Sequence, residues 1–393
     1  MPRPGSQTSL RAANIQRVVD AVRDAGVLSQ AEIARGTGLS PASVSNIVRE
    51  LVSSGDVRVS PGVRGGRRAS MVSLQSDNGV VLGIDFGHQH VRVALADLHH
   101  RVLAERQRRL DVGMADVQAL AAAEDLAEMV LVDAGLGRSD LRAAGAGLPA
   151  PLPSNGKRMS GWPILPGWKV IDLRTDLGTR LGVPVYADND ANLGARGELA
   201  FGAGRGVANL AYVKASSGLG AGLVVDAKVY HGHAGSAGEI GHLTIDETGP
   251  ICSCGNRGCL ETLVGGPYLL ELLRHTHPGL NDVTDLVRRA VEGDGGCRRV
   301  LIDAGRHIGF AAASLCNVVN PERVVLGGDL AAAGGIVLEP IRAAMARYAV
   351  VSVAATPVVA AETGERAEVL GAVMLATEHV TSRTGRSHGV HGL

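Results

Sequence analysis

Apolar side chains recur at helical spacing near the start of the chain. Ile15, Val18, Val19 and Val22 form one such stripe, and they predict a helix over residues 10–25. Gly26 follows directly and ends the pattern.

Two helix-start signals come next. Ser29 stands three residues before Glu32, which is the spacing of a capping box, and predicts a second short helix. Ser40 followed by Pro41 is typical of an N-cap with proline at the first helical position, and it predicts a third helix to about residue 54. Three helices with a glycine-containing turn at 36–39 predict a helix-turn-helix.

The polar face of the third helix is the candidate DNA-reading surface. Small residues allow close approach to the major groove, where Asn favours adenine and Arg favours guanine. The candidate residues on this face are Ser40, Ala42, Ser43, Ser45, Asn46 and Arg49.

A wing is expected after this helix. Two short strands, at 57–60 and 71–74, flank a tip rich in glycine and arginine. Arg64, Arg67 and Arg68 on that tip suit phosphates or a narrow minor groove. The alternative is a small helical packing domain with a solvated arginine loop, but the order of capping box, turn, Ser-Pro start and basic wing favours DNA binding.

Apolar runs and helical patterns alternate through the rest of the chain. The expected strands lie at 80–84, 91–95, 102–106, 145–149, 183–187, 210–214 and 220–225, and the expected helices at about 115–134 and 191–200. This order predicts a strand-rich α/β unit that occurs twice, with a mixed sheet and a cleft between two lobes.

Charge is uneven although the 393 residues balance 39 basic against 39 acidic side chains. Residues 1–75 hold ten arginines and only five acids, so a basic head precedes an acidic body. Such a head indicates a polyanionic partner. We find no apolar run of membrane-spanning length and no leader pattern, so we expect a soluble, cytoplasmic bacterial protein without membrane insertion.

Three of the five cysteines cluster with a histidine. His242, Cys252, Cys254 and Cys259 follow the pattern H-x9-C-x-C-x4-C. Such a set is one of the closed tetrahedral environments of structural Zn²⁺. A disulfide is the alternative, but disulfides are rare in a cytoplasmic protein. The two remaining cysteines stand in helical patterns, where we expect buried apolar side chains.

Several motifs together resemble the ROK family of sugar kinases and sugar-responsive repressors. They are Ile84-Asp-Phe-Gly87, Asp188-Asn-Asp-Ala-Asn192, Gly218-Leu-Gly-Ala-Gly222, Ala237-Gly-Glu-Ile-Gly-His242, the 252–261 loop ending Gly-Cys-Leu-Glu and Val325-Leu-Gly-Gly328. The resemblance implies an α/β body of the two-lobed actin/hexokinase (ribonuclease H-like) type behind the winged helix-turn-helix.

In that family a sugar pocket is lined by the residues that match Asn189, Asp190, Glu239, His242 and Glu261. Carboxylates and amides suit sugar hydroxyls, since each accepts or donates two hydrogen bonds. His242 would bind zinc through one ring nitrogen and reach a hydroxyl through the other. The family often has Asn where this chain has Ile164, so the sugar of a relative does not transfer directly.

The phosphate-binding motifs depart from those of the kinases. Asp190 matches the general base, but the first loop, Asp-x-Gly-Gly-Thr-Lys in the kinases, reads Asp85-Phe-Gly-His-Gln-His90 here. We therefore expect no efficient enzyme, and only a vestigial base. An active sugar kinase with a DNA-binding head, or a repressor controlled by a protein partner, are the alternatives.

The resulting hypothesis is a regulator that responds to a sugar or sugar phosphate. It would repress carbohydrate-utilisation genes, bind a pseudo-palindromic operator as a homodimer or homotetramer, and associate with the nucleoid when bound to DNA. The expected domains are 1–75 (winged helix-turn-helix), 78–187 (first lobe, with a helix at 366–380 packing back on it), 188–365 (second lobe, with zinc loop 242–259) and 381–393 (flexible tail).

Overall fold

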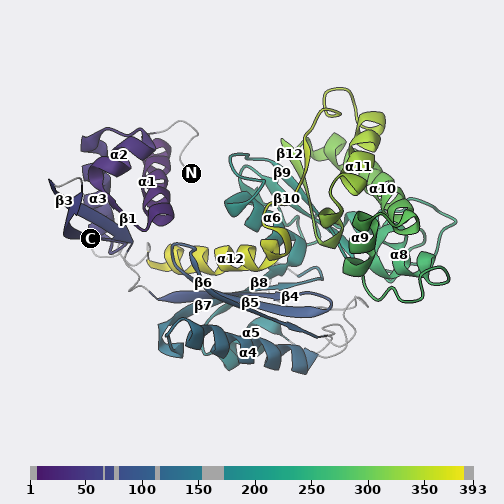
Figure 1. The fold of residues 1–393 in the computed structure, drawn as a ribbon, viewed down its shortest axis with the longest axis horizontal. Helices are drawn as coiled ribbons and strands as arrows, with labels where there is room; N and C mark the ends of the chain where they lie inside the picture. Colours follow the sequence, from purple (N-terminus) through teal and green to yellow (C-terminus); the bar gives the residue numbers. More distant parts are fainter. Residues whose placement is uncertain (1–6, 65–66, 75–78, 111–115, 153–171, 385–393) are drawn as a thin grey trace. The chain divides into compact units, whose positions relative to one another are not determined.

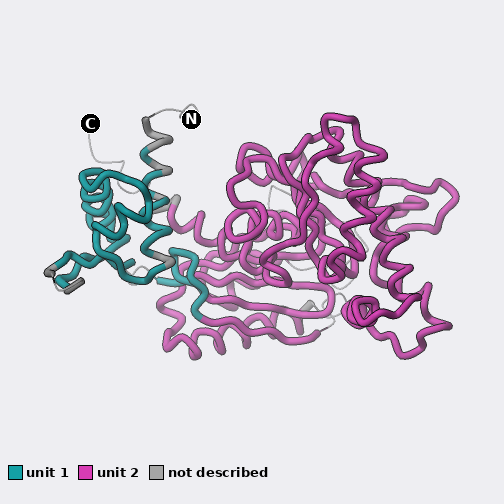
Figure 2. The backbone as a smooth tube through the Cα atoms, turned by 45° about the horizontal axis from the view of Figure 1, so that its top comes forward, with its two compact units in different colours: residues 1–80, 96–103 teal, residues 81–95, 104–393 magenta. Residues whose placement is uncertain are grey.

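The structure is a computed structural model, and it describes residues 7–64, 67–74, 79–110, 116–152 and 172–384. The chain divides into two compact units, residues 1–80 with 96–103 and residues 81–95 with 104–393 (Figure 2). The expectation for Ile164 and that for the end of the tail lie outside the described residues.

The first unit contains the predicted helix-turn-helix. Its helices are α1 (Gln7–Ala25), α2 (Gln30–Thr37) and α3 (Pro41–Ser53), and its sheet has the order β1 (Val27–Ser29), β3 (Arg67–Leu74), β2 (Val57–Arg64). The Ser29–Glu32 capping box forms as predicted, and the Ser40 side chain accepts from the Ser43 amide at 3.1 Å. Gly38 ends α2 with φ 70°, a left-handed conformation that favours glycine.

The wing strands are longer than the sequence predicted. They pair continuously from Val57–Leu74 up to Arg64–Arg67, so the three arginines lie in or at the end of strands and not in an open tip. Pro61 does not break β2 because β2 is an edge strand of this sheet. Strand β1 was not predicted, since three residues carry too little pattern.

Two five-stranded sheets with the same topology lie in the second unit, apart from the strand ends within residues 80 and 96–103 (Figure 1). The first has the order β6 (Val102–Arg109), β5 (His90–Asp97), β4 (Val80–Phe86), β7 (Leu141–Leu148), β8 (Val185–Asn189). The second has the order β11 (Lys228–Val229), β10 (Leu219–Val225), β9 (Leu210–Ala215), β12 (Arg323–Gly327), β13 (Val358–Ala360). Numbered within each sheet, both orders read 3-2-1-4-5, which agrees with the predicted repetition.

Helices cover both sheets. Helices α4 (Asp116–Asp133) and α5 (Leu173–Leu181) lie on one face of the first sheet and α12 (Ala367–Thr384) on the other (Figure 1). Helix α12 continues to Thr384, four residues beyond the end expected for this helix. The second sheet packs against α7 (Glu261–Val264), α8 (Gly266–Leu273), α9 (Val283–Glu292), α10 (Gly295–Val319) and α11 (Gly335–Tyr348) through one apolar core.

Helix α12 also packs closely on α6 (Asp190–Phe201), the helix that follows β8. A Cβ atom at Gly197 would lie 2.1 Å from the Ala367 carbonyl oxygen, and one at Gly371 would lie 1.9 Å from that of Leu193. Only glycine permits such an approach, so the two backbones are in direct contact. Among the described helices, none combines the length and apolar character needed to cross a bilayer.

Candidate functional site

Four side chains from the segment after β11 converge on one point. Ligand atoms of His242, Cys252, Cys254 and Cys259 all lie within 4.8 Å of one another. The thiols are free, with Cys254 Sγ and Cys259 Sγ 3.6 Å apart and Cys252 Sγ 3.6 Å from His242 Nδ1. Sulfur atoms about 3.8 Å apart are what a tetrahedral centre with Zn–S bonds of about 2.3 Å requires. The cluster can therefore hold a metal ion.

The loop that carries the thiols depends on glycine. Gly258 has φ 63°, and a Cβ atom there would lie 1.5 Å from the Asp246 carbonyl oxygen. Two backbone hydrogen bonds, from the Ile245 and Asp246 amides to the Gly258 carbonyl, close the loop on itself. These contacts hold the loop that carries the thiols.

His242 connects this centre to a cavity. Its Nδ1 faces Cys252, whereas its Nε2 lies 3.8 Å from Glu239 Oε2. One ring nitrogen therefore faces the thiols and the other faces the neighbouring carboxylate.

A cavity of about 230 Å³ lies between the two sheets of the second unit. All five residues predicted to line a sugar pocket line it, namely Asn189, Asp190, Glu239, His242 and Glu261. They come from the β8–α6 junction, the loop before the thiols and the start of α7. Sequence positions 72 residues apart are thus brought to one wall.

Two of these side chains are partly used by the backbone. Asn189 caps α6, because its Oδ1 accepts from the Ala191 amide at 2.9 Å and from the Asn192 amide at 3.3 Å. Glu261 Oε2 accepts from the Leu219 amide at 3.1 Å. Asn189 Nδ2 in turn donates to the Ala150 carbonyl at 3.3 Å. Asn189 and Glu261 therefore offer a ligand fewer hydrogen bonds than their residue types suggest.

Glu239 differs from the other carboxylates. Burial, with added repulsion from Asp190 and Glu261, raises the pKa of Glu239 to about 7. A protonated Glu239 can donate a hydrogen bond as well as accept one.

Asp190 forms an ion pair that the sequence did not reveal. Its Oδ2 lies 2.9 Å from Lys214 Nζ, which is also 3.4 Å from Glu368 Oε1. Burial alone would lower the pKa of Lys214, but Asp190, Glu368 and Asp85 together raise it well above its usual value. Tyr212 completes the cluster, since its hydroxyl donates to Glu368 at 3.0 Å. The sequence does contain one signal for this ion pair, because Lys214 is a charged residue within the otherwise apolar strand β9.

The loop that would face a phosphate is filled by a histidine. His90 Nε2 lies 2.9 Å from Asp85 Oδ2, and a Cβ atom at Gly87 would lie 2.3 Å from the His90 ring. Burial opposes ionisation of Asp85, but the hydrogen bond from His90 and the charge of Lys214 lower its pKa. On the opposite loop the Ser216 hydroxyl donates a hydrogen bond to the Asp329 carboxylate.

On α3, the predicted DNA-reading face is accessible to different degrees. Ala42, Asn46 and Arg49 are exposed, Ser43 and Ser45 half-buried, and the exposed Ser40 is engaged as the helix cap. Arg49 Nη1 donates to Asn46 Oδ1 at 3.4 Å. The inner face buries Val44, Ile47, Val48 and Leu51, as predicted. The side chains of Arg64, Arg67 and Arg68 lie outside the described part of the wing.

The fold and the cavity define a two-lobed protein of the actin/hexokinase type joined to a winged helix-turn-helix. The chain belongs to the ROK family, whose profile matches residues 81–379, and a winged helix-turn-helix DNA-binding profile matches residues 12–57. The predicted family and fold class are therefore confirmed.

Known relatives fall into two groups. The chain is 31% identical over 354 residues to the xylose repressor of Caldicellulosiruptor bescii, a match that covers 86% of this chain and 88% of the relative. A ROK family transcriptional regulator, described as a homologue of the E. coli MLC protein, has a TM-score of 0.70 at 25% identity and covers 93% of this chain and 96% of its own. A ROK family glucokinase from Streptomyces griseus, in complex with glucose and AMPPNP, has a TM-score of 0.67 at 26% identity and covers 76% of this chain and all of its own.

Proposed function

We propose that the protein is a transcriptional repressor that binds an operator through α3 and the β2–β3 wing and is released by a sugar. The observation that carries the proposal is the pairing of a helix-turn-helix with a carboxylate-lined cavity in one chain. The similarity to a xylose repressor over both parts of the chain supports it.

The effector is a neutral monosaccharide in the cavity between the sheets. A volume of about 230 Å³ is smaller than the ~300–1,000 Å³ typical of pockets for drug-sized ligands, so one sugar ring is the suitable size. Glu239 and Glu261 present carboxyl groups to hydroxyls, and the charge of Glu261 would repel a phosphate placed beside it. This charge favours a free sugar over a sugar phosphate at that position.

The His/Cys₃ centre holds a structural Zn²⁺. The closed set of three thiols and one imidazole, at the separations given above, supports this assignment. His242, Cys252, Cys254 and Cys259 would hold the ion, and His242 would connect that centre to the wall of the cavity. Its task is to orient His242 and Glu239 towards the sugar.

Phosphoryl transfer is the second candidate, because kinases are among the structural relatives. Two contacts argue against it. A general base must accept the proton of a sugar hydroxyl, whereas Asp190 is paired with Lys214. His90 occupies the space over Gly87 where a backbone amide would approach a phosphate.

The protein acts as a dimer or higher oligomer on a pseudo-palindromic site. Helix-turn-helix proteins read two half-sites about one helical turn, ~34 Å, apart. A sugar that binds two arrangements of the cleft with different affinity shifts their populations and, through the dimer, the spacing of the two α3 helices.

One experiment tests these assignments together. Operator binding is measured while xylose, glucose, other monosaccharides and their phosphates are titrated, with ATP turnover followed in parallel. Release by a free sugar without turnover is the expected result. Turnover that is lost in Asp190→Asn would establish the kinase, and indifference to every sugar would favour a protein partner.

A further inference from the structure

A second group of potential metal ligands stands apart from the His/Cys₃ centre. His277, in the segment between α8 and α9, faces Asp294 and Cys297 at the start of α10. One ligand atom of each lies within 4.8 Å of the others. Residues 20 positions apart in the sequence thus bring imidazole, carboxylate and thiol together.

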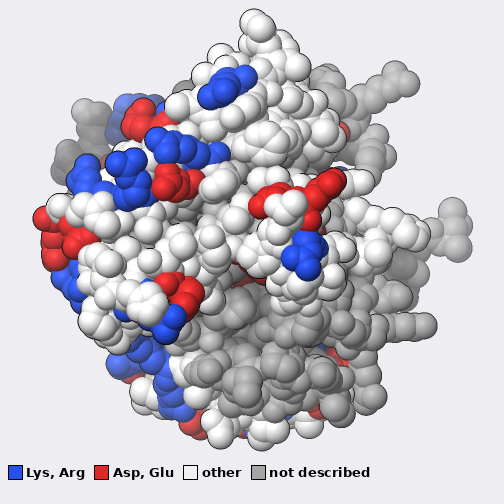
Figure 3. All heavy atoms as spheres, turned by 90° about the vertical axis from the view of Figure 1, so that its right-hand side faces the viewer, with Lys and Arg blue, Asp and Glu red and all other residues white. Residues whose placement is uncertain are grey.

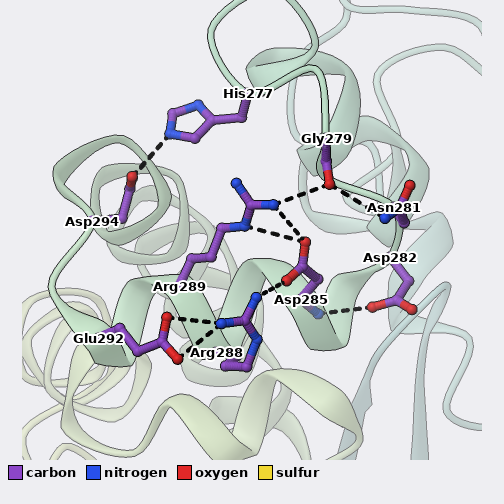
Figure 4. Close-up of polar contacts among 9 residues, drawn as sticks. All are labelled: His277, Gly279, Asn281, Asp282, Asp285, Arg288, Arg289, Glu292 and Asp294. Carbon is purple, nitrogen blue, oxygen red and sulfur yellow. Dashed lines mark hydrogen bonds and ion pairs between the residues drawn. The ribbon is translucent and has the colours of Figure 1, made fainter.

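The histidine ring is held in the orientation that a metal ligand needs. Its Nε2 lies 3.1 and 3.0 Å from the two Asp294 oxygens (Figure 4). Its Nδ1 lies 2.8 Å from Thr276 Oγ1. Histidines that bind metals commonly donate the other ring N–H to such a partner, which fixes the tautomer. Nε2 is therefore the atom presented to the group.

A glycine makes room for the ring. A Cβ atom at Gly296 would lie 2.9 Å from His277 Cε1, which is closer than side-chain atoms normally approach. Any other residue at this position would displace the imidazole from Asp294 and Cys297.

The carboxylate of Asp294 and the thiol of Cys297 both lie at the start of α10. Asp294 Oδ1 accepts from the Cys297 amide at 2.8 Å as the cap of α10, which leaves Oδ2 directed at His277. The Cys297 side chain is fully buried. A thiol in this position can reach an ion that enters past the half-buried His277 and Asp294.

The two arginines of α9 form their hydrogen bonds with residues other than Asp294. Arg289 donates to Asp285 and to the Gly279 carbonyl, and Arg288 donates to Glu292 and Asp285 (Figure 4). Basic and acidic side chains are likewise intermixed on the face drawn in Figure 3. The charge of Asp294 is thus directed to His277 and not to a guanidinium of α9.

We propose that His277 Nε2, Asp294 Oδ2 and Cys297 Sγ bind a second divalent transition-metal ion of the Zn²⁺ class. Imidazole, thiolate and carboxylate are the ligand types that proteins offer to zinc. Three ligands from the protein leave a fourth coordination position for water. On binding, the Cys297 thiol gives its proton to solvent. This site is open, whereas the His/Cys₃ centre is closed.

The ion would tie the α8–α9 segment to α10. Helix α9 begins six residues after His277, and its Thr284 lines the cavity between the sheets. A metal at this position would therefore stabilise one wall of the cavity from behind.

The test is the zinc stoichiometry of the full chain, first stripped with a chelator and then titrated with Zn²⁺ against a chromophoric competitor. We expect two equivalents per chain in the native protein and one in His277→Ala and in Cys297→Ala. Cys316→Ala, which removes another fully buried thiol of α10, should keep two. Cys254→Ser should leave one equivalent, and Cys254→Ser with His277→Ala should leave none, so that failure at either site is distinguished from failure at the other.

Asp294→Asn guards against a folding defect, because asparagine is an equally good helix cap. Loss of an outer partner already costs about 10- to 100-fold in metal affinity, so this variant should weaken the second equivalent at least that much. Co²⁺ bound to Cys254→Ser should show a thiolate-to-cobalt charge-transfer band that disappears in Cys254→Ser with Cys297→Ala. A native protein that binds one equivalent, or a second equivalent that survives His277→Ala, would overturn the proposal.

Discussion

Lys214 Nζ and Asp190 Oδ2 lie 2.9 Å apart in the cleft between the two sheets. The lysine is on β9 and the carboxylate is at the start of α6, so this ion pair joins the second sheet to the helix that follows the first. Both side chains are at most 16% exposed, which makes the pair a buried one.

Loss of Lys214 should destabilise the fold. Lys214→Met leaves Asp190 and Glu368 as buried carboxylates without their cation, and breaking a buried pair in this way costs about 3–5 kcal/mol. The free energy of unfolding from urea titration is the measurement. Lys228→Met, at an exposed position on β11, is the control and should change stability by less than about 0.5 kcal/mol. Equal stability of the two variants would mean that the pair contributes nothing.

Removal of one thiol should separate sensing from DNA binding. Cys254→Ser takes away a ligand of the proposed zinc centre, and His242 then loses its anchor beside Glu239. We expect zinc content to fall by one equivalent per chain and the sugar concentration needed for release to rise about tenfold or more. Operator affinity without sugar should change little. Cys316→Ser is the matched control, and zinc content that is unchanged in Cys254→Ser would refute the ligand assignment.

The wing arginines should contribute affinity more than specificity. Arg67→Ala with Arg68→Ala removes two phosphate contacts if the wing lies on DNA, and the slope of log affinity against log salt should then fall by about 2. Filter binding at several salt concentrations measures the slope. Arg299→Ala, an exposed arginine of α10, is the control for charge alone. A slope equal to that of the native protein would exclude the wing from the interface.

The contact between His231 and Asp188 should make part of the folding stability depend on pH. His231 Nε2 lies 2.8 Å from Asp188 Oδ2, and this hydrogen bond raises the pKa of His231 in spite of its partial burial. The folded-state pKa therefore exceeds the unfolded value of about 6.5. The contribution of the pair is fully present below that unfolded value and is lost as the pH rises through the folded-state pKa.

His231→Gln keeps a hydrogen-bond donor but cannot titrate. The difference in unfolding free energy between the native chain and this variant should thus be largest near pH 5.5 and decline towards pH 8.5. A difference that is constant with pH, or that grows as the pH rises, would contradict the assignment.

Local chemistry was predictable from the sequence. The Ser29–Glu32 capping box and the Ser40–Pro41 helix start depend on residues three positions apart or fewer, and both form as expected. The thiols and His242 lie within 18 positions of one another, and they too come together.

Long-range relationships were not predictable. Lys214 and Glu368 are 154 positions apart, and nothing in either local pattern indicates that they meet. The length of the wing strands was underestimated because a proline usually ends a strand. Pro61 is tolerated within β2 only because β2 lies at the edge of its sheet. His277 was overlooked because its partners follow it on the next-but-one helix.

The glycine contacts between α6 and α12 give the cleft a pivot. At Gly197 and Gly371 the two backbones touch directly, so no side-chain rotamer is available there to absorb a displacement. A rotation of the two sheets about this contact would leave it intact, whereas sliding along it would drive carbonyl oxygens into neighbouring backbone. A sugar of the kind proposed above would therefore select between arrangements of the cleft that differ by rotation about the contact between α6 and α12.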